Sequence, residues 1–197
     1  MANVLIVHAT TGEPTRMIAG RLAEFASEYG HAATVMDAAS GERVPRGRYD
    51  AVIVAASPHR KGHHPSAARF VRANQAWLRH LPSAFFSVAP EAAGADPRAR
   101  ERARKRAEAF PKETGWHPAM VRTVAGAAVP GSRGFLARWA AKLAARRGVA
   151  AATSPGREPT DWERLRSDLE LFLTHAVPAG SVRRATDLRP IFAGEAI

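Results

Sequence analysis

The chain has 197 residues, 46% of them hydrophobic and 24% charged, and its formal net charge is +11. This length suits one domain with a sizeable core. The absence of cysteine excludes disulfides, a thiol nucleophile and thiolate metal sites. No stretch approaches the ~20 apolar residues of a membrane span, and the first residues lack the basic start of a signal peptide. We therefore expect a cytoplasmic protein.

The first predicted element is a buried strand at residues 4–7, where the run Val-Leu-Ile-Val is typical of a strand covered on both faces. A polar turn follows, and then a helix at residues 14–29 with Pro14 in its first turn. The free N–H groups of that helix and the hydroxyls of Thr10, Thr11 and Thr15 together predict an anion site.

Further strands are predicted at residues 32–36, 51–56, 83–88 and 120–126. Helices are predicted at residues 67–81, 98–110 and 135–147, and a last helix begins at Thr160, because residues 160–163 match the capping-box pattern Thr-Asp-Trp-Glu. We divide the chain into a domain at residues 1–175 and a C-terminal tail at residues 176–197, which has no clear periodicity.

Buried strands that alternate with helices predict an α/β fold with a doubly wound, five-stranded parallel sheet. Ligands of such sheets bind beyond the carboxyl ends of the strands. The loops at residues 8–15, 57–66 and 89–97 lie there, so we expect a cofactor between them.

At residues 3–175 the chain resembles flavodoxin-like domains, and more closely the bacterial menaquinone-dependent protoporphyrinogen oxidases. Thr10 and Thr15 match the hydroxyl positions of the flavodoxin phosphate loop, and Ala19 and Leu22 continue that pattern. The other matches, in chain order, are residues 49–50, 56–57, 62–63, 66–67, 82–88, 116–118, 124–127 and 160–163.

The resemblance implies the flavodoxin-like strand order 2-1-3-4-5 and noncovalent FMN, with its phosphate on the first loop and its ring between the other two. It also implies oxidation of protoporphyrinogen IX to protoporphyrin IX with a quinone as acceptor, a step of haem biosynthesis. It names no catalytic residue. The cofactor residues expected are Ala9, Thr10, Thr11, Gly12, Glu13, Pro14, Thr15, Ser57, His59, Gly62, His63, Ser87, Val88 and Ala89.

The chain departs from the family pattern in each of the three loops. Glu13 stands where the family has a glycine, and a carboxylate there repels a phosphate unless it points away. His63 and His64 occupy the place of a tyrosine that could stack on the flavin, and the third loop has no aromatic residue. We expect no metal ion at His59, His63 and His64, because no carboxylate lies beside them. Since this loop should face the ligand, the three histidines either contact flavin or an acidic substrate, or they lie on a solvated surface loop.

Two basic segments remain. Residues 98–106 hold six basic residues and one acidic residue without interleaved aromatics, so we interpret them as a solvated helix face and expect no nucleic-acid partner. In residues 132–147 one helical face is apolar and another basic. That helix either lies in a membrane interface or packs on the domain. The expected substrate or membrane contacts are His64, Phe135, Arg138, Trp139 and Lys142.

Three functions follow from these patterns. The first is an FMN-dependent oxidoreductase peripheral to the inner membrane that acts on a porphyrinogen. The second is a flavodoxin-like electron carrier without an organic substrate of its own. The third is a non-catalytic module that has lost FMN.

Overall fold

The computed structural model describes residues 1–60, 62–93, 96–126 and 160–177. Within them, five strands form one parallel sheet in the order β2-β1-β3-β6-β7. The strands are β1 (Asn3–Ala9), β2 (Ala32–Asp37), β3 (Ala51–Ala56), β6 (Ser83–Val88) and β7 (Met120–Val124). The predicted α/β class, strand number and strand order are confirmed.

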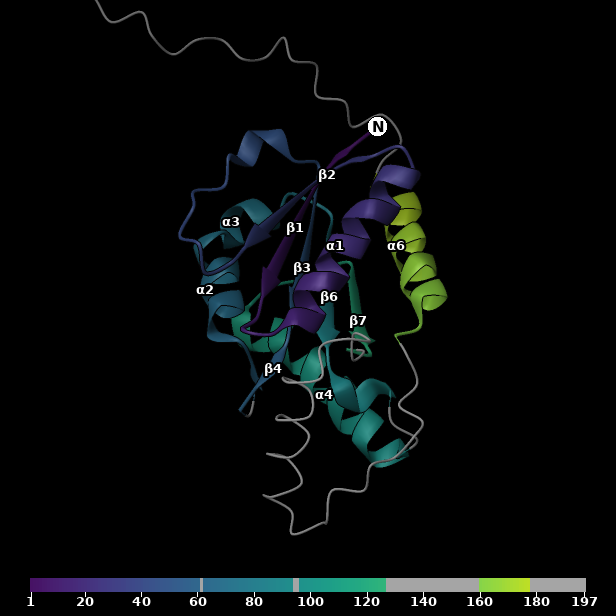
Figure 1. The fold of residues 1–197 in the computed structure, drawn as a ribbon. Coiled ribbons are helices and arrows are strands. Elements are labelled where there is room, and N and C mark those ends of the chain that lie inside the picture. Colours follow the sequence, from purple (N-terminus) through teal and green to yellow (C-terminus); the bar gives the residue numbers. More distant parts are fainter. Residues whose placement is uncertain (61, 94–95, 127–159, 178–197) are drawn as a thin grey trace, which may run out of the picture.

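Helices cover both faces of this sheet (Figure 1). One face carries α1 (Glu13–Glu28) and α6 (Trp162–Ala176). The other carries α2 (Pro65–Ala73), α3 (Gln75–Leu78) and α4 (Pro97–Thr114). Short 3₁₀ turns lie at Arg46–Arg48 and Pro90–Ala93.

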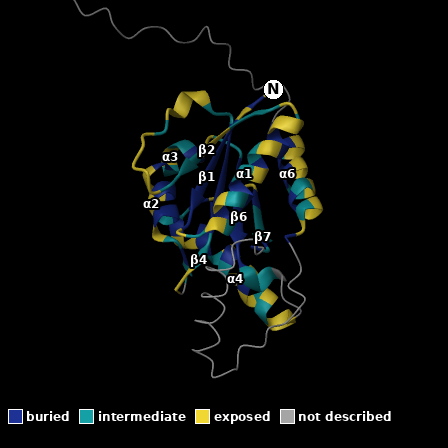
Figure 2. Ribbon diagram, viewed as in Figure 1, coloured by how far each residue is buried: buried dark blue, intermediate teal, exposed yellow. Residues whose placement is uncertain are grey.

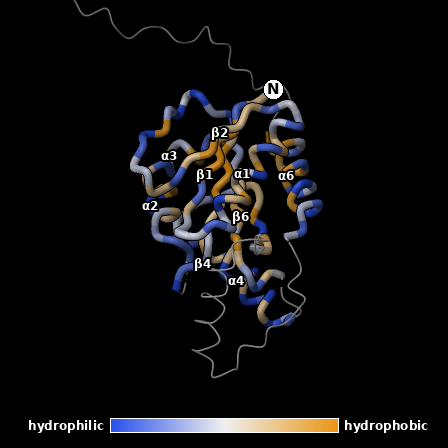
Figure 3. The backbone as a smooth tube through the Cα atoms, in the orientation of Figure 1, coloured by the Kyte–Doolittle hydropathy of each residue, from blue (hydrophilic) through white to orange (hydrophobic). Residues whose placement is uncertain are grey.

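Alternate residues of each central strand face opposite helix layers, as strand geometry requires. In β1, Val4 and Ile6 pack in the core beneath α1 and α6, whereas Leu5 and Val7 pack beneath α2 and α4. Strands β1, β3 and β6 are almost wholly buried (Figure 2) and are among the most hydrophobic parts of the chain (Figure 3). The edge strand β2 is partly exposed, which explains its less apolar sequence.

The helix predicted at residues 67–81 is wrong in extent, because the structure divides it at Asn74. The Asn74 amide nitrogen donates a hydrogen bond to the Phe70 carbonyl at 2.9 Å, and its amide oxygen accepts one from Arg46. The helix predicted at residues 98–110 continues to Thr114 with Pro111 inside it, and Gly115 then takes a left-handed φ of 66°.

Two boundaries near the chain's C-terminal half also differ from the prediction. The strand expected at residues 120–126 ends at Val124. Asp161, not Thr160, caps α6, because the Asp161 carboxylate accepts from the Arg164 N–H at 2.9 Å. The Thr160 hydroxyl instead donates to the Ala125 carbonyl at 2.9 Å and ties the start of α6 to the end of β7. The helix predicted at residues 135–147 and most of the tail lie outside the described residues.

In the described part of the chain, no helix combines the length and apolarity needed to cross a membrane.

Candidate functional site

The first loop connects β1 to α1 at the carboxyl end of the sheet. Gly12 is the N-cap of α1, and no side chain caps the helix. Thr10 shapes the turn, because its hydroxyl oxygen accepts the Gly12 N–H at 2.9 Å. The N–H groups of Glu13 and Thr15 therefore stay free at the positive end of the helix, while Pro14 has none to offer.

Thr15 is the polar side chain of this loop that is most deeply buried, with 1% exposure. It lines a cavity together with Thr11 and Gly12, and its hydroxyl has no hydrogen-bond partner among the described residues. A hydroxyl that borders a cavity beside free helix N–H groups suits an anionic oxygen. This donor set fits a phosphate group.

The Glu13 side chain points away from that cavity. It is 63% exposed and lies 3.3 Å from the Arg16 guanidinium, one turn further along the helix. The carboxylate also stands in the first helical turn, where negative charge is favourable. Because the Glu13 side chain is turned away from the cavity, its carboxylate would not repel a phosphate bound there, although the sequence had suggested such repulsion.

The second loop contains a small hairpin that the sequence did not predict. Strand β4 (Pro58–His59) pairs antiparallel with β5 (Gly62–His63). His59 and His64 both line the cavity of the first loop, and their rings meet edge to face with centroids 5.7 Å apart.

His63 faces the other way and does not line the cavity. It is 9% exposed, and its Nε2 lies 2.8 Å from the Ser87 hydroxyl oxygen. Its ring contacts Phe85 and Phe110 edge to face, with centroids 5.0 and 5.1 Å away. Burial, together with the nearby Arg106 guanidinium, lowers the pKa of His63 to about 4. His63 and Ser87 therefore belong to the core beneath the third loop.

The third loop and the residues after β7 close the cavity. Pro58, Pro90 and Gly126 line it, although they were not among the cofactor residues predicted from the sequence. Gly126 is close-packed, since a Cβ there would lie 3.2 Å from Val88 Cγ1 and 3.5 Å from Pro14 Cβ. A signal for Gly126 existed in the sequence, because it lies in residues 124–127, one of the stretches that match the family pattern.

The structure thus brings together eight of the expected cofactor residues and His64 around one cavity of about 120 Å³. Ala9, Glu13, Gly62, His63, Ser87 and Ala89 do not line it. Phe135, Arg138, Trp139 and Lys142 lie outside the described residues. The expected residues that line it are Thr10, Thr11, Gly12, Pro14, Thr15, Ser57, His59 and Val88.

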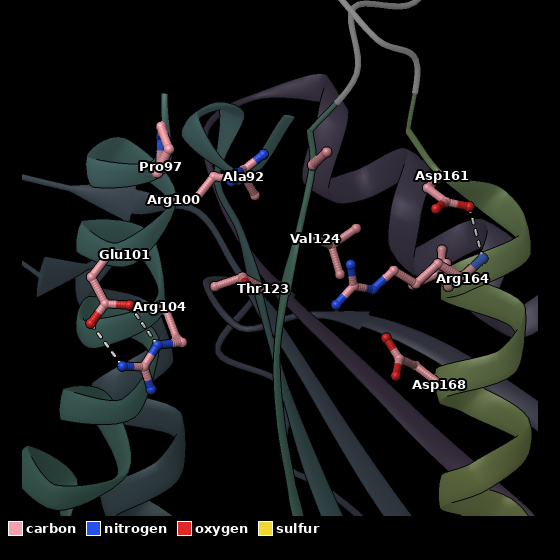
Figure 4. A pocket seen from close by; sticks show the side chains of 12 residues that line it. Ala92, Pro97, Arg100, Glu101, Arg104, Thr123, Val124, Asp161, Arg164 and Asp168 are labelled. Carbon is pink, nitrogen blue, oxygen red and sulfur yellow. Dashed lines mark hydrogen bonds and ion pairs between the residues drawn. The ribbon is translucent and has the colours of Figure 1, made fainter. Parts of the chain in front are cut away.

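A second cavity of about 520 Å³ lies between α4, β7 and α6 (Figure 4). Its carboxylates already have partners: Glu101 pairs with Arg104 at 2.7 Å, Asp168 pairs with Arg122 at 2.7 Å, and Asp161 caps α6. The Arg164 guanidinium, by contrast, has no ion pair within the described residues. The two cavities adjoin along the third loop, where Pro90 lines the first and Ala92 the second.

Residues 5–146 match the family model described as "Flavodoxin domain". The chain belongs to the flavodoxin family. Membership of this family indicates FMN as the cofactor, in agreement with the phosphate-fitting first loop. The match is to the family as a whole and does not distinguish the protoporphyrinogen oxidases within it. No curated protein matches the sequence.

Solved flavodoxin structures resemble this flavodoxin-family chain over most of its length. A short-chain flavodoxin associated with a non-canonical PDU bacterial microcompartment is 12% identical, with a TM-score of 0.50, and the match covers 89% of this chain and 99% of that one. Oxidised flavodoxin 1 from Bacillus cereus is 14% identical with a TM-score of 0.50, and the match covers 88% and 99% of the two chains. At these identities the likeness shows the fold alone.

Proposed function

We propose that this flavodoxin-family protein is an FMN-dependent oxidoreductase that oxidises protoporphyrinogen IX and reduces a quinone. The porphyrinogen gives up hydrogen as electrons and protons, and the quinone takes up both to become a quinol. Bound FMN supplies the redox chemistry, which the protein directs by position and electrostatics. The observation that carries the proposal is the cavity where the first, second and third loops meet at the carboxyl end of the sheet.

The chain's own residues hold the phosphate end of the cofactor in this proposal. The Thr11 and Thr15 hydroxyls and the free N–H groups of Glu13 and Thr15 supply the hydrogen bonds, and Thr10 keeps the turn in shape. The cavity of about 120 Å³ is smaller than the ~300–1,000 Å³ of a typical ligand pocket. It therefore suits the phosphate and part of the chain attached to it, with the ring lying outward toward His59 and His64.

The residues that line the second cavity favour the binding of an anionic substrate. Protoporphyrinogen carries two propionate groups, and arginine binds carboxylates through paired N–H donors. Arg164 offers such a donor pair into a cavity that adjoins the proposed cofactor site (Figure 4). The resemblance of residues 3–175 to the protoporphyrinogen oxidases supports this substrate independently.

The test begins with purified protein, whose visible spectrum and bound small molecule are measured. We expect flavin absorbance and a ligand with the mass of FMN. Protoporphyrinogen IX is then added with a quinone analogue, and the red fluorescence of protoporphyrin is followed against the nonenzymatic rate. Arg164→Gln should raise KM for the porphyrinogen and leave FMN affinity unchanged. A yellow protein that produces no porphyrin above background would contradict the substrate assignment.

An electron-carrier function is the second candidate, and membership of the flavodoxin family favours it. A carrier would bind FMN and exchange electrons with a redox protein, but would not bind a porphyrinogen. Isothermal titration with a non-oxidisable porphyrin dicarboxylate separates the two functions. Saturable binding that Arg164→Gln weakens supports the enzyme, and no binding supports the carrier.

Peripheral contact with a membrane is proposed from the sequence of residues 132–147, which lie outside the described residues. The pattern of apolar and basic side chains there suits an anionic lipid surface, and a membrane is where a quinone acceptor dissolves. Cosedimentation with vesicles containing anionic lipid tests it. Binding should fall when Phe135 and Trp139 are both replaced by alanine, and equal sedimentation of both proteins would contradict it.

A further inference from the structure

His64 lines the cofactor cavity and is at the same time the N-cap of α2. Histidine is an uncommon capping residue, since serine, threonine, aspartate and asparagine are preferred. Here the ring replaces the usual oxygen, because its Nδ1 accepts the N–H of Ser66 at 3.4 Å. The Ser66 hydroxyl lies 2.8 Å from the same nitrogen, and Ser66 is fully buried.

These two contacts determine which ring nitrogen carries the proton. A backbone N–H can only donate, so the Nδ1 that it faces must hold a lone pair. The Ser66 hydroxyl then donates to that nitrogen as well. In a neutral imidazole the other nitrogen bears the hydrogen, so Nε2 of His64 is an N–H donor.

We propose that His64 is held as the neutral Nε2–H tautomer and donates a fixed hydrogen bond to an acceptor atom of the cofactor in the first cavity. This inference rests on the FMN site proposed above and deepens it. Because the ring turns Nδ1 toward α2, the edge that bears Nε2 is the one left to face a ligand. His64 is thus a positioning residue for the flavin and takes the place of a stacking aromatic side chain.

The surroundings keep the His64 ring neutral. Partial burial lowers the pKa of His64, and electrostatic interactions with His59 on β4 and Arg69 on α2 lower it further, while Asp37 at the end of β2 raises it. The N-terminus of α2 also disfavours a cation. Protonation of Nδ1 would set an N–H against the Ser66 N–H and break the cap. A donor that stays neutral around pH 7 binds an acceptor without adding a titrating charge.

Nitrogen-15 NMR of the histidine rings tests the tautomer, and it does so without FMN. In the wild-type protein between pH 6.5 and 8, His64 should show a protonated Nε2 and an unprotonated Nδ1. In Ser66→Ala, which removes the hydroxyl donor but keeps the backbone N–H of residue 66, the Nε2–H tautomer should persist. An Nδ1–H tautomer or a charged ring in the wild type at pH 7 would overturn the inference.

FMN titration of the apoprotein tests the hydrogen bond itself. His64→Asn keeps an acceptor for the α2 cap but removes Nε2–H, so thermal unfolding should change little while the Kd for FMN rises about tenfold. The matched control is His80→Asn, at an exposed histidine in the turn after α3, which does not line the cavity and should leave the Kd unchanged. An unchanged Kd in His64→Asn would overturn the inference and leave the FMN site intact. Failure of the wild type to bind FMN would instead contradict the proposed function.

Discussion

His63 on β5 and Ser87 on β6 form a buried pair, with the imidazole Nε2 2.8 Å from the hydroxyl oxygen. Phe85 and Phe110 enclose the ring, and the Nδ1 of His63 has no partner within the described residues. The pair holds the second loop against the sheet while His59 and His64, on either side of it in the sequence, face the cavity. His63 is therefore a structural residue, whereas the other two histidines line the cavity.

Stability should fall in mild acid because of His63. Its pKa in the folded protein is about 4 against an ordinary value of 6.5, owing mainly to burial. As the pH falls below about 6.5, His63 is protonated in the unfolded chain before it is protonated in the folded protein. The contribution of neutral His63 to the free energy of unfolding is therefore complete above that pH and is lost toward pH 4. The loss between pH 7 and pH 4.5 should be about 2 kcal/mol, measured by urea unfolding at the two pH values.

The double variant His63→Phe with Ser87→Ala is the control for this pH effect, because it fills the site without a titrating or unpaired polar group. Its stability should vary less with pH than that of the wild type. His80→Asn, at an exposed site, should retain the wild-type pH dependence. Equal pH dependence in the double variant and the wild type would show that His63 is not responsible.

The Thr15 hydroxyl should contribute directly to FMN affinity. Thr15→Val keeps the shape of a side chain that is 1% exposed and removes only the oxygen. Loss of one hydrogen bond to a phosphate should raise the Kd for FMN by about tenfold, measured by quenching of flavin fluorescence. Thr15→Ser keeps the oxygen and should stay near the wild-type value. If the two variants bind FMN equally well, the hydroxyl does not contact the phosphate.

The charge of Glu13 should have little effect on the affinity for FMN, although its position in the first loop suggests repulsion of the phosphate. Its carboxylate is exposed and paired with Arg16, so solvent and the guanidinium screen it from the phosphate. Glu13→Gln should therefore change the Kd for FMN by less than about twofold. A large gain in affinity at low salt would show that the carboxylate turns toward the cofactor.

The fold could be predicted from the sequence because its central strands are continuous apolar runs that leave few alternatives. Residues 51–56 and 83–88 are strands in the structure with the predicted bounds. The break at Asn74 could not be foreseen, since it depends on a bond from Arg46, far away in the sequence. Helix α4 passes through Pro111 because tertiary packing buries that residue, whereas local propensity argues for an end there.

The site was predictable to the level of its loops and less so for single side chains. Thr11, Thr15 and Ser57 line the cavity as expected, because a strand end followed by a helix fixes their place. The direction in which the His63 side chain points is set by the two-residue strand β5. A strand of two residues is too short to show an alternating pattern in the sequence, so this direction could not be predicted. Gly126 was not predicted as a cofactor residue, because the last strand was predicted two residues too long and therefore included it.

Gly126→Ala should destabilise the protein and weaken FMN binding. Its Cβ would meet the nearly buried Val88 at 3.2 Å and Pro14 at 3.5 Å, so either the end of β6 or the start of α1 must shift. We expect a loss of about 1 kcal/mol in the free energy of unfolding, together with a higher Kd for FMN. Gly20→Ala is the matched control: nothing lies within 4 Å of its Cβ, and alanine in α1 should add about 1 kcal/mol. Stabilisation by both changes would mean that α1 and β7 do not approach closely at Gly126.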